Sequence, residues 1–211
     1  VTSKLHKKDA VHDVSLKVRR GEIVCIAGID GNGQSEFVYG LTGLEPLREG
    51  KITLAGEDVS KTSIRQRSVL GMSHIPEDRH KHGLVLDYTL EDNLVLQRYF
   101  EPEFTNKAGF LRRDNIRKYA DRLIEDYDVR SGQGPVTPAR AMSGGNQQKA
   151  IIAREIDKDP ELLVLDEVMD VPDRILVMYE GEIVGELDPK KTTQEELGLY
   201  MAGARRDEVK A

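Results

Sequence analysis

The sequence is short of cysteine, of long apolar runs and of basic charge. Its single cysteine, Cys25, cannot form an internal disulfide, and no cluster of Cys and His residues has the spacing of a zinc site. No run approaches the ~20 apolar residues of a membrane-spanning helix, and no charged-then-apolar leader indicates secretion. The 31 Lys and Arg against 37 Asp and Glu give a net charge of −6, which argues against bulk binding of nucleic acid. These absences predict a soluble, cytosolic protein.

The patterning of the remaining residues predicts an α/β fold. With 211 residues, 38% hydrophobic and 32% charged, the chain can bury a core in one domain or two small lobes. Apolar runs predict strands over 14–18, 23–27, part of 50–60, 71–75 and 162–165, and a hairpin of 174–178 with 182–184. Helices are expected over 36–41, 89–94, 116–127, 143–156 and from Thr192 or Thr193 to about Ala202.

Two of these helices carry specific signals. Thr89 and Asp92 resemble a capping box that opens the helix ending at Leu94. The helix over 116–127 has one apolar stripe, which is most simply a core face. The stripe consists of Ile116, Tyr119, Ala120, Leu123, Ile124 and Tyr127.

A glycine-rich loop lies between the strand at 23–27 and the helix at 36–41. The strand is a continuous apolar run, typical of a strand covered on both faces, with Cys25 as a small buried side chain. Residues 28–35 fit a phosphate-binding loop, except that Gln34 stands where lysine belongs. The loop's backbone N–H groups and the start of the helix would bind phosphate, and the Ser35 hydroxyl would bind Mg²⁺. Without the lysine, the motif alone also fits an ordinary glycine turn.

A second anion site is predicted where Ser143, Gly144 and Gly145 open a helix. The serine offers a hydroxyl, and the two glycines leave their backbone amides unobstructed. Taken alone, the same residues also fit a plain serine N-cap. Two such sites in one chain favour binding of a phosphorylated ligand.

The motifs together resemble the ATP-binding cassettes of ABC transporters over nearly the whole chain. The segment 143–149, Ser-Gly-Gly-Asn-Gln-Gln-Lys, resembles the signature of bacterial ribose-type import ATPases. Residues 74–79, His-Ile-Pro-Glu-Asp-Arg, with Gly-Leu-Val at 83–85, resemble the stretch that replaces the glutamine loop in their second cassette. Residues 28–35 and the Leu-Tyr-Met-Ala-Gly of 199–203 most resemble the nucleoside-uptake branch.

The resemblance implies a fold and a set of binding residues. The fold is a P-loop (ABC) core with an antiparallel β edge sheet and a helical subdomain, divided as 1–83, 84–157 and 158–211. The implied cofactors are ATP and Mg²⁺, with Ser35 and Glu77 as the metal ligands. The ATP-binding residues are Gly28, Asp30, Gly31, Asn32, Gly33, Gln34, Ser35, Glu36, Ser143, Gly144 and Gly145.

The implied function is the second, degenerate cassette of an ABC importer for nucleosides or simple sugars. Its partners are a first cassette or a second copy, integral membrane permease subunits and, indirectly, an extracytoplasmic substrate-binding protein, but no nucleic acid. The place of action is the cytoplasmic face of the membrane, and the isolated chain is expected to hydrolyse little ATP. The absence of lysine at Gln34 leaves a non-hydrolysing regulatory module as an alternative. An ABC ATPase acting on DNA or ribosomes is a further alternative, which the lack of heptads and basic blocks disfavours.

The interval before the C-terminal hairpin is too short for this family. Only the eight residues 166–173 separate two predicted strands, whereas a parallel crossover needs about a dozen or more. Residues are therefore missing between Glu161 and Val171, or the chain has a true deletion. Asp166 and Glu167 fit a Walker B end, but the match of 168–175 favours the segment that follows the switch residue. The sequence therefore names no catalytic base.

Overall fold

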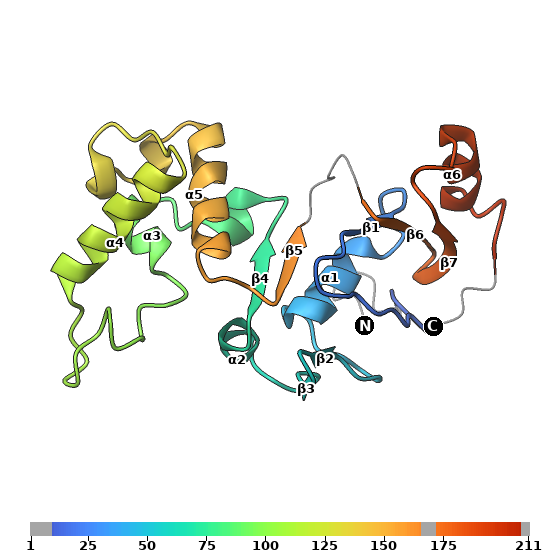
Figure 1. Ribbon diagram of the computed structural model, residues 1–211, viewed down its shortest axis with the longest axis horizontal. Helices are drawn as coiled ribbons and strands as arrows, with labels where there is room; N and C mark the ends of the chain where they lie inside the picture. The colour runs from blue at the N-terminus through green and yellow to red at the C-terminus, as the bar shows by residue number, and fades with distance from the viewer. Residues whose placement is uncertain (1–9, 166–171, 208–211) are drawn as a thin grey trace. The chain divides into compact units, whose positions relative to one another are not determined.

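The computed structural model describes residues 10–165 and 172–207 (Figure 1). The chain divides into two compact units, one of Val1–Arg67 with Asp166–Ala211 and one of Ser68–Leu165. The interruption predicted between Glu161 and Val171 is not found over Leu162–Leu165, which form a strand; the rest of that interval, with Asp166 and Glu167, lies outside the described residues. No helix in the described ranges is both long and apolar enough to span a membrane.

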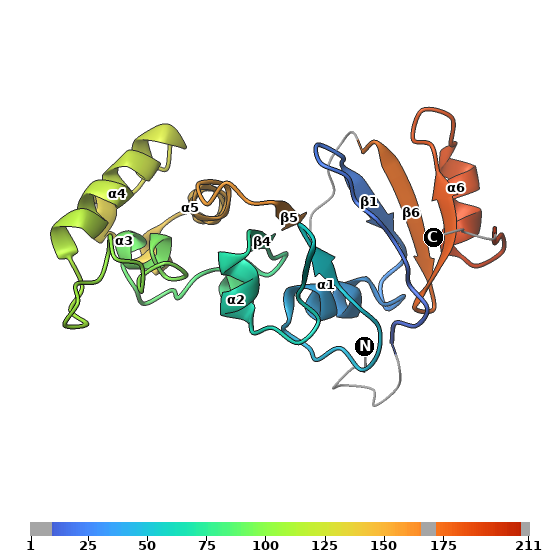
Figure 2. The same ribbon diagram turned by 60° about the horizontal axis from the view of Figure 1, so that its bottom comes forward.

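The first unit contains a three-stranded sheet of order β1-β6-β7 (Figure 2). Strand β1 (Val24–Ala27) runs parallel to β6 (Arg174–Tyr179), and β7 (Glu182–Leu187) completes the predicted antiparallel hairpin. Helix α6 (Gln194–Met201) packs against this hairpin, with Tyr200 fully buried. Helix α1 (Gln34–Thr42) follows β1, and the short strands β2 (Thr53–Leu54) and β3 (Glu57–Asp58) pair antiparallel.

The second unit is mainly helical and contains a two-stranded sheet. Strands β4 (Met72–Ile75) and β5 (Leu162–Leu165) run parallel, with Met72 opposite Leu162. The helices are α3 (Leu90–Leu94), α4 (Arg113–Asp126) and α5 (Gly144–Ile156), with a π-helical turn η1 (Arg79–Gly83) and two short 3-10 turns, η2 (Gly134–Val136) and η3 (Ala139–Ala141). Helix α2 (Ile64–Val69) precedes β4.

Local signals in the sequence account for several of these helices. The Thr89 hydroxyl accepts a hydrogen bond from the Asp92 amide and begins α3, as the capping box predicts. Thr193 caps α6 in the same way through the Glu196 amide. The apolar stripe of α4 is confirmed as a core face, since Ile116 and Leu123 are fully buried in a cluster with Phe104 and Leu94.

The prediction of a strand over 14–18 is wrong. Residues 14–18 form no strand, and the carbonyl of Lys17 accepts a hydrogen bond from the Arg174 side chain instead of from another strand. Alternation of apolar residues predicts a surface that one face can bury, but a strand also needs a neighbour whose backbone pairs with it.

The prediction that β1 and β5 are fully covered is also wrong. All four residues of each strand, Cys25 among them, are partly exposed, although partial burial raises the pKa of the Cys25 thiol. Among the described residues, β1 pairs only with β6 and β5 only with β4, so each strand stands at the edge of its sheet. A strand at a sheet edge leaves part of its surface uncovered.

Candidate functional site

The predicted phosphate loop connects β1 to α1 through residues with left-handed backbone. Gly31 and Gly33 have φ angles of 87° and 104°, values that glycine adopts without strain. A Cβ at Gly33 would also lie only 2.6 Å from the Ala10 carbonyl oxygen. Glycine at position 33 is therefore required twice, by its backbone angle and by the close approach of residue 10.

Asn32 fixes this loop to the β6–β7 hairpin. Its side-chain nitrogen donates to the Met178 carbonyl at 3.3 Å, and its side-chain oxygen accepts from the Glu180 amide at 3.4 Å. The Gly181 amide donates to the Asn32 carbonyl at 2.9 Å. The side chain is 7% exposed, so Asn32 serves the shape of the loop.

The side chain of Gln34 folds back over the start of the loop. A Cβ at Gly28 would overlap the Gln34 amide and would lie 2.8 Å from the Met178 carbonyl oxygen. Glycine at position 28 therefore makes room for Gln34. The group lying beside the loop is a neutral amide, whereas a lysine would bring a positive charge for phosphate.

The first turn of α1 retains the features that bind an anion. Ser35 and Asp30 are exposed and Glu36 is partly buried, and among the described residues the Ser35 hydroxyl has no hydrogen-bond partner. The first N–H groups of a helix lack intrahelical acceptors, and the helix dipole adds positive potential there. The loop therefore fits a phosphate group, and Ser35 is free to bind a cation that accompanies it.

The second predicted anion site lies in the helical unit. Ser143 is the N-cap residue of α5, but its side chain makes no capping hydrogen bond. Its Oγ accepts instead from the Asn146 side-chain nitrogen at 2.9 Å. Thr89 and Thr193 cap their helices through their hydroxyls, whereas the Ser143 hydroxyl does not. The uncapped first turn of α5 is what an anion site requires.

The segment 77–83 packs against the same helix. The ring nitrogen Nε2 of His80 lies 3.0 Å from the Gln147 side-chain oxygen, and a Cβ at Gly83 would lie 2.6 Å from Ile151 Cδ1. Asp78 caps the π-helical turn by accepting from the amides of residues 80 and 81. These backbone hydrogen bonds, chiefly that from Lys81, lower the pKa of the Asp78 carboxyl.

The predicted site residues fall in both units. Residues 28–36 lie in the first unit, while Ser143, Gly144, Gly145 and Glu77 lie in the second. Glu77 is exposed. Among residues 10–165 and 172–207, no group of three or more His, Cys, Asp or Glu side chains is arranged to hold a metal. A metal ion bound through Ser35 would thus rely on the phosphates of a ligand for further oxygen atoms.

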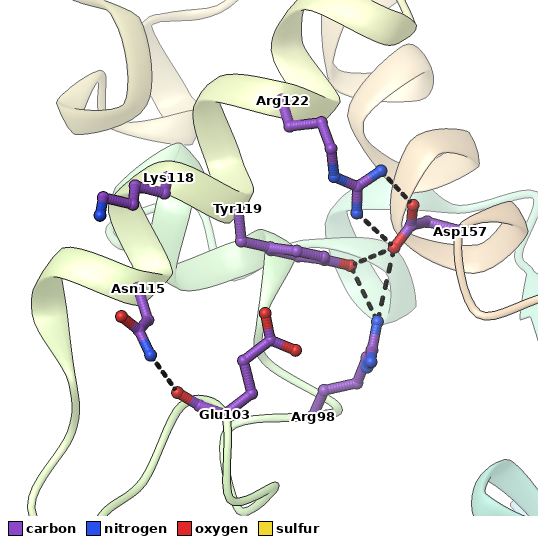
Figure 3. Close-up of a pocket in the computed structure, with 7 residues that line it drawn as sticks. All are labelled: Arg98, Glu103, Asn115, Lys118, Tyr119, Arg122 and Asp157. Carbon is purple, nitrogen blue, oxygen red and sulfur yellow. Dashed lines mark hydrogen bonds and ion pairs between the residues drawn. The ribbon is translucent and has the colours of Figure 1, made fainter.

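Sequence reasoning missed a polar pocket of about 570 Å³ in the helical unit (Figure 3). Asp157, at the end of α5, accepts from the Tyr119 hydroxyl at 2.9 Å and from Arg122 at 2.7 Å. Arg98 lies 5.5 Å and Arg122 5.3 Å from the centre of the Tyr119 ring. Burial and the nearby Asp157 raise the pKa of Tyr119. The ion pairs of Asp157 with Arg98 and Arg122 join α4 to the end of α5.

A strand, glycine loop and helix in one unit, with an uncapped Ser-Gly-Gly helix in the other, define a P-loop nucleotide-binding protein. Comparison with known families gives the particular group. The family model described as ABC transporter matches residues 11–170, so the chain belongs to the ABC transporter family.

Named relatives and a solved structure extend this result. The chain is 42% identical to the guanosine import ATP-binding protein NupO of Bacillus subtilis, over 95% of this chain and 46% of that protein. It is 30% identical to the ribose import ATP-binding protein RbsA of Bacillus licheniformis, over 94% of this chain and 47% of that protein. The chain thus spans about half the length of these relatives. The dimeric cassette MJ0796 with ADP and Pi has the same fold, with a TM-score of 0.66, 17% identity, and coverage of 85% of this chain and 90% of that one.

The relatives are also longer within the matched region. Because 95% of 211 residues is about 200, the alignment of 237 positions with NupO includes about 37 at which this chain has no residue. An internal stretch of that length is about what a helix and a further strand need. The excess agrees with the expectation, from the short interval at 166–173, that this chain lacks residues which the family contains.

Proposed function

We propose that the chain is the second, degenerate cassette of the ATP-binding subunit of an ABC importer for nucleosides or simple sugars. The names of the guanosine and ribose import relatives support this class of substrate. Two observations support the asymmetry: Gln34 places a neutral amide over Gly28, while Ser143 leaves the first turn of α5 uncapped. The uncapped Ser143 carries the proposal.

Each site would then have a different task. The loop at 28–36 holds ATP weakly, with Mg²⁺ on Ser35 and the ATP phosphates. Ser143, Gly144 and Gly145 complete the site of a first cassette, where the hydroxyl and the free amides stabilise charge on the terminal phosphate. Gly28, Asp30, Gly31, Asn32, Gly33 and Glu36 shape and flank the chain's own loop.

The proposed partners are a first cassette, permease subunits in the membrane and, through them, an extracytoplasmic substrate-binding protein. The chain would act at the cytoplasmic face of the membrane. The helical unit exposes Val85 and Tyr88, at 38% and 50%, in the segment that follows η1. Apolar side chains exposed in one region support docking of a protein partner there.

Reconstitution tests this function. The test uses vesicles that contain the permease, the binding protein and a protein in which this chain is joined to a first cassette. These vesicles should take up guanosine or ribose only with ATP. Cysteines introduced at residues 77–90 should crosslink to the permease, and cysteines in the β6–β7 hairpin should not. Uptake without ATP dependence, or crosslinks from the hairpin alone, would contradict the proposal.

A non-hydrolysing regulatory module is the second candidate, favoured by the neutral Gln34 beside the loop. This alternative predicts that ATP binding to this chain affects hydrolysis by the two-cassette protein, and that substitution of Ser143 does not. Turnover of the two-cassette protein separates the two functions, because only the importer model requires Ser143 for hydrolysis.

A further inference from the structure

The guanidinium group of Arg79 lies against the start of α5. A Cβ at Gly144 would lie 2.9 Å from Arg79 Nη2, 3.4 Å from Cζ and 3.7 Å from Nε. The backbone of Gly144 does not have a positive φ angle, so its conformation does not itself require glycine. The close approach of Arg79 is what excludes a side chain at this position.

Arg79 has no counter-charge among the described residues. Its Nε atom is buried without a hydrogen-bond partner, and no carboxylate of the described chain forms an ion pair with it. The Nε of Arg67 also lacks a partner, but its Nη1 donates to the carbonyls of Gly40 and Leu41, whereas no atom of the Arg79 guanidinium has a hydrogen-bond or ion-pair partner among the described residues. A guanidinium that is partly exposed and unpaired within the described chain can donate its N–H groups to an anion.

Two independent features thus converge at one point of the helical unit. The first turn of α5 has no side-chain cap, because the Ser143 hydroxyl accepts from Asn146. The unpaired guanidinium lies beside the same turn, at Gly144. A guanidinium and backbone N–H groups are together the donors that bind phosphate oxygens in proteins.

We propose that Arg79 is a further phosphate-binding residue of the Ser143–Gly145 site, and that it contacts the terminal phosphate of a nucleoside triphosphate. The identity of the ligand rests on the proposed function, in which this site faces the nucleotide of a first cassette. Arg79 supplies the fixed positive charge for that phosphate, while the helix supplies neutral donors. Glycine at 144 keeps the two sets of donors within reach of one ligand.

Binding of inorganic tripolyphosphate to the full 211-residue chain tests this site without a first cassette. In NMR titrations, the amide signals of residues 144 and 145 should shift and saturate. Arg79→Gln should raise the Kd at these signals at least fivefold, and Arg79→Lys should raise it less. Arg140→Gln removes an exposed arginine that is paired with Asp87 in the same unit, and it should leave the Kd unchanged.

Gly144→Ala provides a second variant that keeps the charge. Its methyl group should displace the guanidinium and weaken binding, while the dispersed spectrum shows that the chain remains folded. Inorganic phosphate and ATP serve as further probes: preference for the two triphosphates supports a terminal-phosphate site, and equal binding of phosphate alone overturns it. Signals of residues 28–36 report separately on the chain's own loop.

In the two-cassette protein, Arg79→Gln should raise the KM for ATP several-fold with a smaller change in kcat. An unchanged Kd for tripolyphosphate in Arg79→Gln would overturn the proposal whatever the ATPase result. A normal tripolyphosphate response together with no ATPase activity would instead contradict the proposed function and leave the Arg79 site standing.

Discussion

Each unit begins a helix with a glycine-containing candidate anion site, and the two candidates differ in the side chains beside them. In the first unit, the loop has the required backbone geometry at Gly31 and Gly33, while Gln34 places a neutral amide beside it. In the second unit, Ser143 leaves the helix uncapped and Arg79 adds an unpaired cation. The first candidate therefore has the backbone geometry without a cation, whereas the second combines an open helix start with a guanidinium.

The largest expected difference between the two sites is in ATP turnover by a protein that contains both cassettes. Ser143→Arg should abolish hydrolysis, because it removes a donor and fills the site, and losing one such donor alone costs on the order of 10²–10³-fold. Gln34→Ala should cost only a few-fold, since a neutral amide contributes little to phosphate binding. Steady-state phosphate release measures both, and equal losses would refute the asymmetry.

A positive charge at position 34 should increase the affinity of the loop at 28–36 for Mg-ATP. A cation about 4 Å from a phosphate contributes up to about 4 kcal/mol at an effective dielectric of about 20, so Gln34→Lys should lower the Kd of this chain for Mg-ATP at least tenfold. Isothermal titration calorimetry gives the Kd, with Gln34→Met as the control that changes the same side chain without adding a charge. No gain in affinity would mean that the loop geometry, rather than the charge, limits binding.

The cores of the two units should also respond differently to truncation. Leu123 is fully buried in the helical core, so Leu123→Ala should lower the free energy of unfolding by about 2–5 kcal/mol. Ile26 in β1 is partly exposed, and Ile26→Ala should cost less than half as much. Urea denaturation gives both values, and Asp121→Ala on the exposed face of α4 is the control. Equal costs would show that β1 is as well covered as α4.

The smallest effect concerns the helix caps. Thr89→Ala and Thr193→Ala should each cost about 1 kcal/mol, because each removes a capping hydrogen bond. Ser143→Ala should cost only a few tenths of a kcal/mol, since its hydroxyl makes no capping bond. Thermal unfolding compares the three variants, and a cost at Ser143 equal to that at Thr89 would assign Ser143 a purely structural role.

Much of the fold was predictable because its signals are local. Capping residues Thr89 and Thr193, the stripe of α4 and the loop glycines act within one or two turns of chain. The predictions failed where a distant partner decides the outcome. Residues 14–18 found no strand to pair with, and β1 and β5 each stand at an edge among the described residues.

The sequence motifs located the candidate site, but they did not predict the side-chain contacts within it. The spacing of Gly28, Gly33 and Ser35 indicated a phosphate loop, yet nothing in the spacing showed that Gln34 folds over Gly28. Arg79 belongs to a motif that the sequence analysis identified, but no role was assigned to it. Its contact with Gly144 joins residues 65 positions apart, which the motif alone does not predict. Asp157, Tyr119 and Arg122 likewise meet only through tertiary packing.

The most direct test of the asymmetry is to measure ATP binding and phosphate release by this chain alone in one sample. Fluorescence anisotropy of a labelled ATP reports binding, and a coupled phosphate assay reports turnover. The account predicts weak, Mg²⁺-dependent binding with almost no phosphate released. Brisk hydrolysis by the isolated chain would contradict it, because a site without a cation at position 34 and without a partner cassette would then be catalytically complete.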